Sequence, residues 1–147
     1  KMERKRKVTA REQLIAWDDV YDQKGSSEIF MEAMRNCLEH HMERNDFFKR
    51  YMEAAGVKPE ELHLEQDLWR IPPIHANFFK KYEILSVPME DIVEHATSSG
   101  TTGQKSQMFF DQDSFDFGNA MVKNEFRHFG FLGRKGSECH IWEYWQF

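Results

Sequence analysis

The groups best suited to chemistry lie in one short polar segment, residues 97–106. The segment consists of hydroxyl side chains, glycines, a glutamine and a lysine: Thr97, Ser98, Ser99, Gly100, Thr101, Thr102, Gly103, Gln104, Lys105 and Ser106. Glycines let the backbone turn through positive φ and present N–H groups to a ligand, while hydroxyls and an ammonium add donors and positive charge. This composition predicts an anion-binding loop with a polyphosphate as its natural ligand.

A solvated hairpin loop has the same composition, because Ser, Thr and Gly are ordinary turn residues. Composition alone leaves these two interpretations open. Spacing excludes two known phosphate motifs, since GxxxxGK[ST] requires a glycine directly before the lysine, whereas Gln104 precedes Lys105, and no GxGxxG is present. The segment is therefore neither a P-loop nor a dinucleotide-binding turn.

Two predicted strands flank the polar segment. Residues 92–97 alternate between apolar and polar side chains and lead directly into it, and residues 107–110 leave it as a short, mostly apolar run. Asp113 or Ser114 is then expected to cap a helix whose apolar positions keep the helical period as far as Gly130. A further strand is expected over residues 139–144.

Helices are predicted before the flanking strands. Apolar spacing indicates helices over residues 11–22, 28–44 and 47–55, the second capped by Ser26 or Ser27 after a break at Gly25, the third capped by Asn45 or Asp46. A short helix with Phe78 and Phe79 follows Asn77. The order is helices first and then strand, loop, strand and helix, which predicts an α/β fold, or α+β for a fragment.

The composition indicates a folded domain whose core is rich in aromatic residues and methionine, because 14% of the 147 residues are aromatic and 8 are Met. The net charge is −5, and the bases gather in the first seven residues, so residues 1–10 are predicted to be a basic tail. Lys and Arg form no later cluster. We therefore expect no nucleic-acid partner.

The apolar runs and the cysteines of the chain bear on where the protein is located and on whether it binds a metal. The chain has no apolar run of membrane-spanning length and no secretory pattern, and Cys37 and Cys139 lack CxxC spacing, so a cytoplasmic protein is expected. Cys37 and His41 resemble half of a zinc site, but no second pair at ligand spacing accompanies them. We therefore expect Cys37 in the core and predict no metal site. His95 is expected to be an ordinary strand histidine rather than a phosphate ligand.

The polar segment and the residues before it resemble the acyl-protein synthetase (LuxE-like) family of the adenylate-forming, AMP-binding superfamily. Three stretches carry the resemblance: Thr97-Ser98-Ser99-Gly100-Thr101-Thr102-Gly103, which is similar to the superfamily's phosphate-binding signature; Trp69-Arg70-Ile71-Pro72-Pro73-Ile74; and Phe78 to Val87, with Lys105-Ser106 and Asp111 beyond the loop. The resemblance covers about residues 25 to 130. Phenylacetate-CoA ligases are similar but more distant.

This resemblance implies a ligase that uses ATP, with Mg²⁺ assisting, to activate a carboxylic acid, here a fatty acid, as an acyl-adenylate. The acyl group then passes to a thiol, so an acyl-acceptor protein is an implied partner. The implied phosphate-binding residues are Ser98, Ser99, Gly100, Thr101, Thr102, Gly103 and Lys105. The resemblance assigns no catalytic residue, because none of these groups needs to act as a nucleophile or base.

Residues 11–147 correspond, by the same resemblance, to the N-terminal portion of an adenylate-forming domain. The acyl pocket and the C-terminal lid would lie beyond Phe147, so we expect the chain by itself to be inactive. Two alternatives remain open. One is a non-catalytic module that binds a nucleotide or another anion, and the other is an interaction domain that docks a partner or self-associates through C-terminal aromatics such as Trp142 and Trp145.

Overall fold

The computed structural model describes residues 7–98 and 105–130, which mix helices with one small antiparallel sheet. The elements are α1 (Ala10–Ile15), α2 (Gln23–Arg44), α3 (Asp46–Ala54), the 3₁₀ turns η1 (Pro59–Glu61) and η2 (Glu65–Arg70), α4 (Phe78–Lys81), the 3₁₀ turn η3 (Met89–Asp91), β1 (Ile92–Thr97), β2 (Gln107–Asp111) and α5 (Gln112–His128). This content agrees with the predicted α/β character of a fragment. The strand predicted over residues 139–144 lies outside the described residues.

The long helix α2 begins earlier than predicted. Gly25, Ser26 and Ser27 do not break the chain but lie in the first two turns of α2, and the N-cap is Asp22, whose Oδ1 accepts a hydrogen bond from the Gly25 N–H at 2.9 Å. A Cβ on Gly25 would clash with the Asp22 carboxylate. Glycine therefore makes room for the cap at this position, and the serines are ordinary helix residues.

The first helix is shorter than the predicted range of 11–22. It starts with a capping box in which Thr9 and Glu12 bond each other's backbone N–H groups, and it ends at Ile15. Aspartates after this point compete for local N–H groups, and Asp19 accepts from the Tyr21 N–H at 2.9 Å. Residues 17–22 therefore form turns that lead into α2.

The core lies between α2, α3 and η1. Its buried members are Met31, Leu38, Met52, Val57 and Leu62, and the partly buried Phe30, Met42, Phe48, Leu68 and Ile71 pack around them. Met52 and Leu62 are fully enclosed, at 0% exposure. The core is thus built from methionine and aliphatic side chains, with aromatic rings only at its edge.

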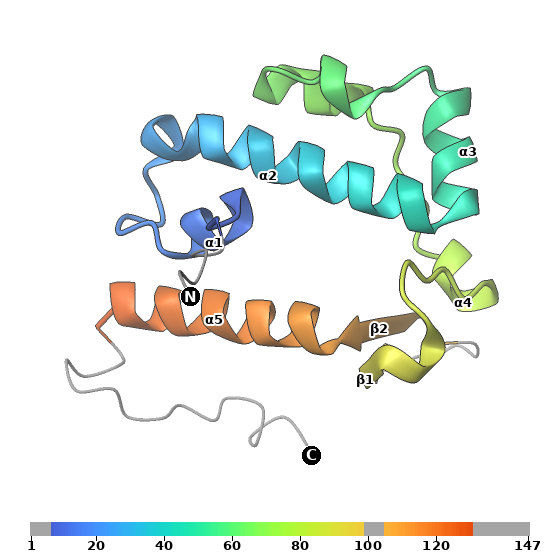
Figure 1. Cartoon of the computed structure of the whole chain (residues 1–147). Helices are drawn as coiled ribbons and strands as arrows, with labels where there is room; N and C mark the ends of the chain where they lie inside the picture. The colour runs from blue at the N-terminus through green and yellow to red at the C-terminus, as the bar shows by residue number, and fades with distance from the viewer. Residues whose placement is uncertain (1–6, 99–104, 131–147) are drawn as a thin grey trace, which may run out of the picture.

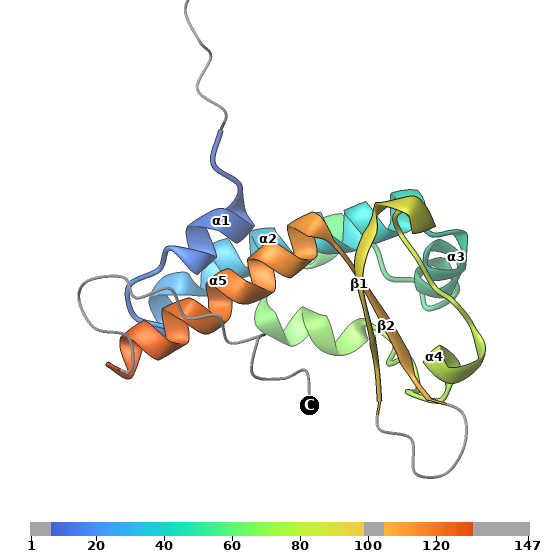
Figure 2. The same cartoon turned by 90° about the horizontal axis from the view of Figure 1, so that it is seen from below.

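The sheet and α5 extend from this core. In Figure 1, α1 lies between α2 and one end of α5, while β1 and β2 lie at the other end of α5. Figure 2 shows the two strands running side by side away from α2 and α5. The helix α5 has no buried residue, so a thin set of contacts rather than a second core holds it in place.

Candidate phosphate-binding site

The polar segment joins two antiparallel strands. The register pairs Thr97 with Gln107, His95 with Phe109 and Ile92 with Asp111. Of the predicted phosphate-binding residues, the structure describes Ser98 and Lys105, at the two sides of the hairpin end; Ser99, Gly100, Thr101, Thr102 and Gly103 lie outside the described residues. Lys105 is exposed and Ser98 is half-buried.

Two hydrogen bonds close the described end of the hairpin. The Ser98 N–H donates to the Ser106 carbonyl at 3.1 Å, and the Ser106 N–H donates to the Ser98 hydroxyl oxygen at 2.9 Å. The Ser98 side chain therefore has a structural partner on the opposite strand. This pairing sets the distance between the two backbone segments that enter and leave the loop.

One face of the hairpin carries an aromatic pair. The rings of His95 and Phe109, which are cross-strand partners, are stacked with their centroids 4.4 Å apart and their planes at 10°. Cross-strand pairs of this kind stabilise a two-stranded sheet. His95 thus has the structural role expected of a strand histidine.

Contacts from α2 and α3 hold the segment that leads into β1. The amide of Asn45, a buried residue, donates to the Leu85 carbonyl at 2.9 Å, and its Oδ1 caps α3 by accepting from the Phe48 N–H. His41 Nδ1 lies 2.7 Å from the Ser86 hydroxyl oxygen. These two side chains fix residues 85–86 against the end of α2, six residues before β1 begins at Ile92.

The two other stretches that carry the family resemblance also pack on α3. The Tyr51 hydroxyl donates to the Pro73 carbonyl at 2.8 Å. On α4, the ring of Phe78 stacks on Phe47 and lies at a tilt against Tyr82, with centroid distances of 4.8 and 4.5 Å. The Pro-Pro and Phe-Lys stretches therefore form a scaffold that runs from α3 to the hairpin, since α4 also contacts β2.

The electrostatics of the hairpin differ from those of a P-loop. In a P-loop the phosphate sits at a helix N-terminus, which follows the loop directly. Here β2 separates the loop from α5, and its five residues span about 17 Å at the usual rise of a strand. The N-terminus of α5 is thus separated from the loop by the length of β2, and Lys105 is a cation at the hairpin end.

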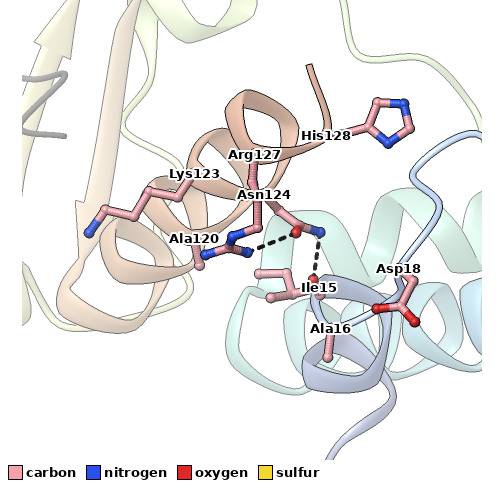
Figure 3. A pocket seen from close by; sticks show the side chains of 8 residues that line it. All are labelled: Ile15, Ala16, Asp18, Ala120, Lys123, Asn124, Arg127 and His128. Carbon is pink, nitrogen blue, oxygen red and sulfur yellow. Dashed lines mark hydrogen bonds between the residues drawn. The ribbon is translucent and has the colours of Figure 1, made fainter. Parts of the chain in front are cut away.

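Two cavities lie away from the hairpin. The larger, of about 730 Å³, is mainly apolar and lies between α1, α2 and α5, with Trp17, Phe30, Met34, Phe117 and Met121 in its wall. The smaller, of about 520 Å³, is shown in Figure 3; Asn124 lies in its wall, between α1 and α5, bonded to the Ile15 carbonyl. Neither wall contains a residue of β1 or β2.

The expectation that Cys37 is a core residue is wrong. Its side chain is exposed on the wall of the larger cavity, because the core of α2 lies on the face that carries Met31 and Leu38. Burial of the sulfur among neighbouring atoms still raises the pKa of the Cys37 thiol, against the opposing effect of Arg11. Among residues 7–98 and 105–130 no three His, Cys, Asp or Glu side chains come together as a metal site.

Sequence reasoning missed three residues that organise the site: Ser106, Ser86 and Tyr51. Ser106 acts through its backbone and Tyr51 through a carbonyl 22 residues away, so neither contact has a signature in residue type. The signal for this pair lies in Ser98, a serine directly after the last paired residue of β1, where its hydroxyl oxygen accepts from the opposite strand.

Comparison with known proteins shows to which family this chain is similar. The family model for acyl-protein synthetase, LuxE, matches residues 12–126. Phenylacetate-coenzyme A ligase of Pseudomonas putida is 27% identical over 114 residues, which are 76% of this chain and 26% of that ligase. The enzyme of the same name from Escherichia coli (strain K12) is 30% identical over 115 residues, or 75% and 25%. The chain spans about a quarter of the length of these relatives. No helix in the described part is long and apolar enough to cross a membrane.

Proposed function

Because the chain belongs to the LuxE acyl-protein synthetase family, we propose that residues 11–147 are the N-terminal portion of an ATP-dependent ligase that activates a carboxylic acid and transfers its acyl group to a thiol. The predicted basic tail, residues 1–10, includes Thr9 and Ala10, which belong to α1 as its N-cap and its first residue. The two relatives named above are both called ligases, and each matches about three quarters of the chain. The part of the proposed site that the structure describes is the hairpin of β1 and β2.

The proposed reaction has two steps. A carboxylate oxygen attacks the α-phosphorus of ATP, the bond from that phosphorus to the bridging oxygen breaks, and pyrophosphate leaves. A thiol sulfur then attacks the acyl carbonyl carbon, the bond to the AMP oxygen breaks, and the thiol proton passes to solvent. The first step builds negative charge on the leaving phosphates, so it depends on positioning and electrostatic stabilisation rather than on a protein nucleophile.

The described residues fit the phosphate end of ATP. Lys105 is an exposed ammonium at the hairpin end, and we assign it, with Ser98, Ser99, Gly100, Thr101, Thr102 and Gly103, to phosphate binding. The described part of the chain offers no carboxylate cluster for a cation. Mg²⁺ would supply charge neutralisation at the phosphates when bound.

The observation that carries the proposal is the family match, which spans the hairpin and the segments that hold it. The Pro-Pro and Phe-Lys stretches pack on α3, α4 contacts β2, and Asn45 and His41 hold the segment that leads into β1. The family name, acyl-protein synthetase, points to an acyl group and a protein acceptor, which we take to be a fatty acid and a protein thiol, whereas the names of the relatives above point to phenylacetate and coenzyme A.

The test is carboxylate-dependent exchange of labelled pyrophosphate into ATP by the full-length natural polypeptide. Decanoate, myristate and phenylacetate are compared, with Mg²⁺ present. We expect exchange with a fatty acid, and loss of at least ten-fold when Thr101→Ala and Thr102→Ala are combined. Ser27→Ala is the control, because it removes a hydroxyl on α2 that bonds Glu65 far from the hairpin.

The alternatives predict other results. If phenylacetate is the only acid that supports exchange, the substrate is phenylacetate rather than a fatty acid, and the proposed reaction stands. Absence of exchange with every acid would contradict the ligase. If ATP still raised the melting temperature, and the threonine pair abolished that shift, the protein would be a nucleotide-binding module without chemistry.

A further inference from the structure

We infer that Ser98 is a positioning residue, which closes the base of the phosphate loop by binding the opposite strand. This inference rests on the proposed function and refines the role of one residue assigned to phosphate binding. The observation is the pair of hydrogen bonds between Ser98 and Ser106, in which one residue uses its side chain and the other only its backbone.

The geometry of this pair departs from a regular ladder. In an antiparallel sheet, two hydrogen-bonded partners exchange N–H to carbonyl bonds in both directions. Ser98 and Ser106 keep one of these bonds, from the Ser98 N–H to the Ser106 carbonyl at 3.1 Å. In the other, the Ser98 hydroxyl oxygen takes the place of its carbonyl as the acceptor of the Ser106 N–H, at 2.9 Å. The ladder thus ends on a side chain.

The position of the pair gives this bond its effect. Thr97 and Gln107 are the last ladder partners of β1 and β2, and Ser98 and Ser106 follow them directly on the loop side. The pair therefore holds the two backbones at strand separation at the point where the loop begins and ends. Removing the hydroxyl leaves a half-buried N–H of Ser106 without this acceptor, and the base of the loop can open.

The bond to Ser106 uses one acceptor lone pair of the Ser98 hydroxyl, whose O–H can still donate. Lys105 is exposed whereas Ser98 is half-buried. We therefore assign charge recognition to Lys105 and the loop, and to Ser98 the geometry of the loop base. The double variant described below tests whether the Ser98 O–H also contacts the phosphate.

Four variants of the full-length natural polypeptide test the assignment. Ser98→Ala removes the acceptor, and Ser106→Pro removes the donor while keeping the Ser106 carbonyl. Ser98→Thr keeps a hydroxyl, and Ser106→Ala keeps the backbone N–H. We expect the first two to raise the KM for ATP in pyrophosphate exchange by about five-fold, as the loss of one hydrogen bond would. The other two should stay within about two-fold of wild type.

The double variant separates positioning from direct contact. If both residues act through one bond, Ser98→Ala combined with Ser106→Pro raises the KM no further than either change alone. Multiplying effects would show that Ser98 contacts the phosphate directly, and would overturn the inference. So would a Ser98→Ala enzyme with an unchanged KM.

A readout independent of activity is amide hydrogen exchange at Ser106. We expect slow exchange in the wild type and faster exchange in Ser98→Ala, with slow exchange restored in Ser98→Thr. Equal amide exchange rates at Ser106 in all three proteins would refute the hydrogen bond between Ser98 and Ser106, even if the enzyme is active. The two readouts fail separately. If neither the wild type nor any variant catalyses pyrophosphate exchange, the proposed function is wrong. If the Ser106 amide still responds to the substitutions as expected, the hydrogen bond between Ser98 and Ser106 is confirmed all the same.

Discussion

Asn124 on α5 donates a hydrogen bond from its side-chain amide to the backbone carbonyl of Ile15, the last residue of α1, at 2.8 Å. The two residues are 109 positions apart in the chain. The same amide lies 3.5 Å from the Trp17 carbonyl, and the Asn124 Oδ1 accepts from Arg127. One side chain thus satisfies the end of α1 and orients a cation on the next turn of α5, as Figure 3 shows.

Asn124→Ala is expected to destabilise the protein by about 1 kcal/mol, because it removes a half-buried hydrogen bond between two helices that share few other contacts. Urea denaturation followed by circular dichroism measures the change. Lys123→Ala, on an exposed neighbouring position of α5, is the control and should shift stability by less than about 0.5 kcal/mol. Equal stability of Asn124→Ala and wild type would show that the hydrogen bond from Asn124 to Ile15 contributes no net free energy to folding.

Gly118→Ala is expected to stabilise the protein by about 0.5–1 kcal/mol, because glycine in a helix interior costs that much relative to alanine. Gly118 lies within α5, and a Cβ there would meet no atom within 4 Å. Thermal unfolding of both variants checks the change. The matched variant is Gly56→Ala, which also has free space but a φ of +67°, so it should destabilise by about 1 kcal/mol. A lower melting temperature for Gly118→Ala would mean that its methyl group disturbs the cavity wall.

Asp111→Ala should cost about 1 kcal/mol, because it removes the N-cap of α5. The sequence predicted Asp113 or Ser114 for this role, but Asp111, the last residue of β2, accepts from the Ser114 N–H at 2.9 Å and ends the strand where the helix starts. Asp111→Asn keeps an acceptor and should recover most of the loss in a denaturation experiment. Equal losses in both variants would assign the effect to the charge rather than to the cap.

The same carboxylate makes stability depend on acid pH. The hydrogen bonds from Ser114 hold the pKa of Asp111 below its ordinary value of 3.8. The folded state therefore favours the charged form, and the stabilisation present above pH 3.8 is lost as the pH falls through the lower, folded-state pKa. Acid titration of the melting temperature should show a smaller drop for Asp111→Asn than for wild type. Identical acid curves would contradict the lowered pKa.

His41 gives a second pH dependence in a higher range. Burial, with a smaller contribution from His40, lowers the pKa of His41 below its ordinary value of 6.5. The unfolded state then binds the proton more readily, so stability is complete above pH 6.5 and falls as the pH drops below it. His41→Gln removes this titration and keeps an amide near Ser86. Unfolding free energies at pH 7.5 and 5.5 should differ less in the variant, and equal differences would refute the assignment.

Local signals in the sequence were sufficient for the elements near the site. The helix after Asn45, the short helix at Phe78 and the two strands around the loop appear where periodicity and caps predicted them. Caps at Asp22 and Asp111 were not predicted, although aspartate is a common N-cap residue. Several hydroxyl and carboxyl residues stood within one turn of each helix start, and the choice among them depends on backbone angles that residue types do not set.

The sequence by itself determined the helices and strands next to the site and that the polar loop joins two strands, because these features depend on residues one to four positions apart. Tertiary structure alone decided that Asn124 binds the end of α1, that Asn45 and His41 hold residues 85–86, and that Cys37 faces a cavity rather than the core. These contacts join residues 40 or more positions apart, or depend on which face of α2 is buried. Such pairings depend on how the helices pack, and no local pattern specifies the packing.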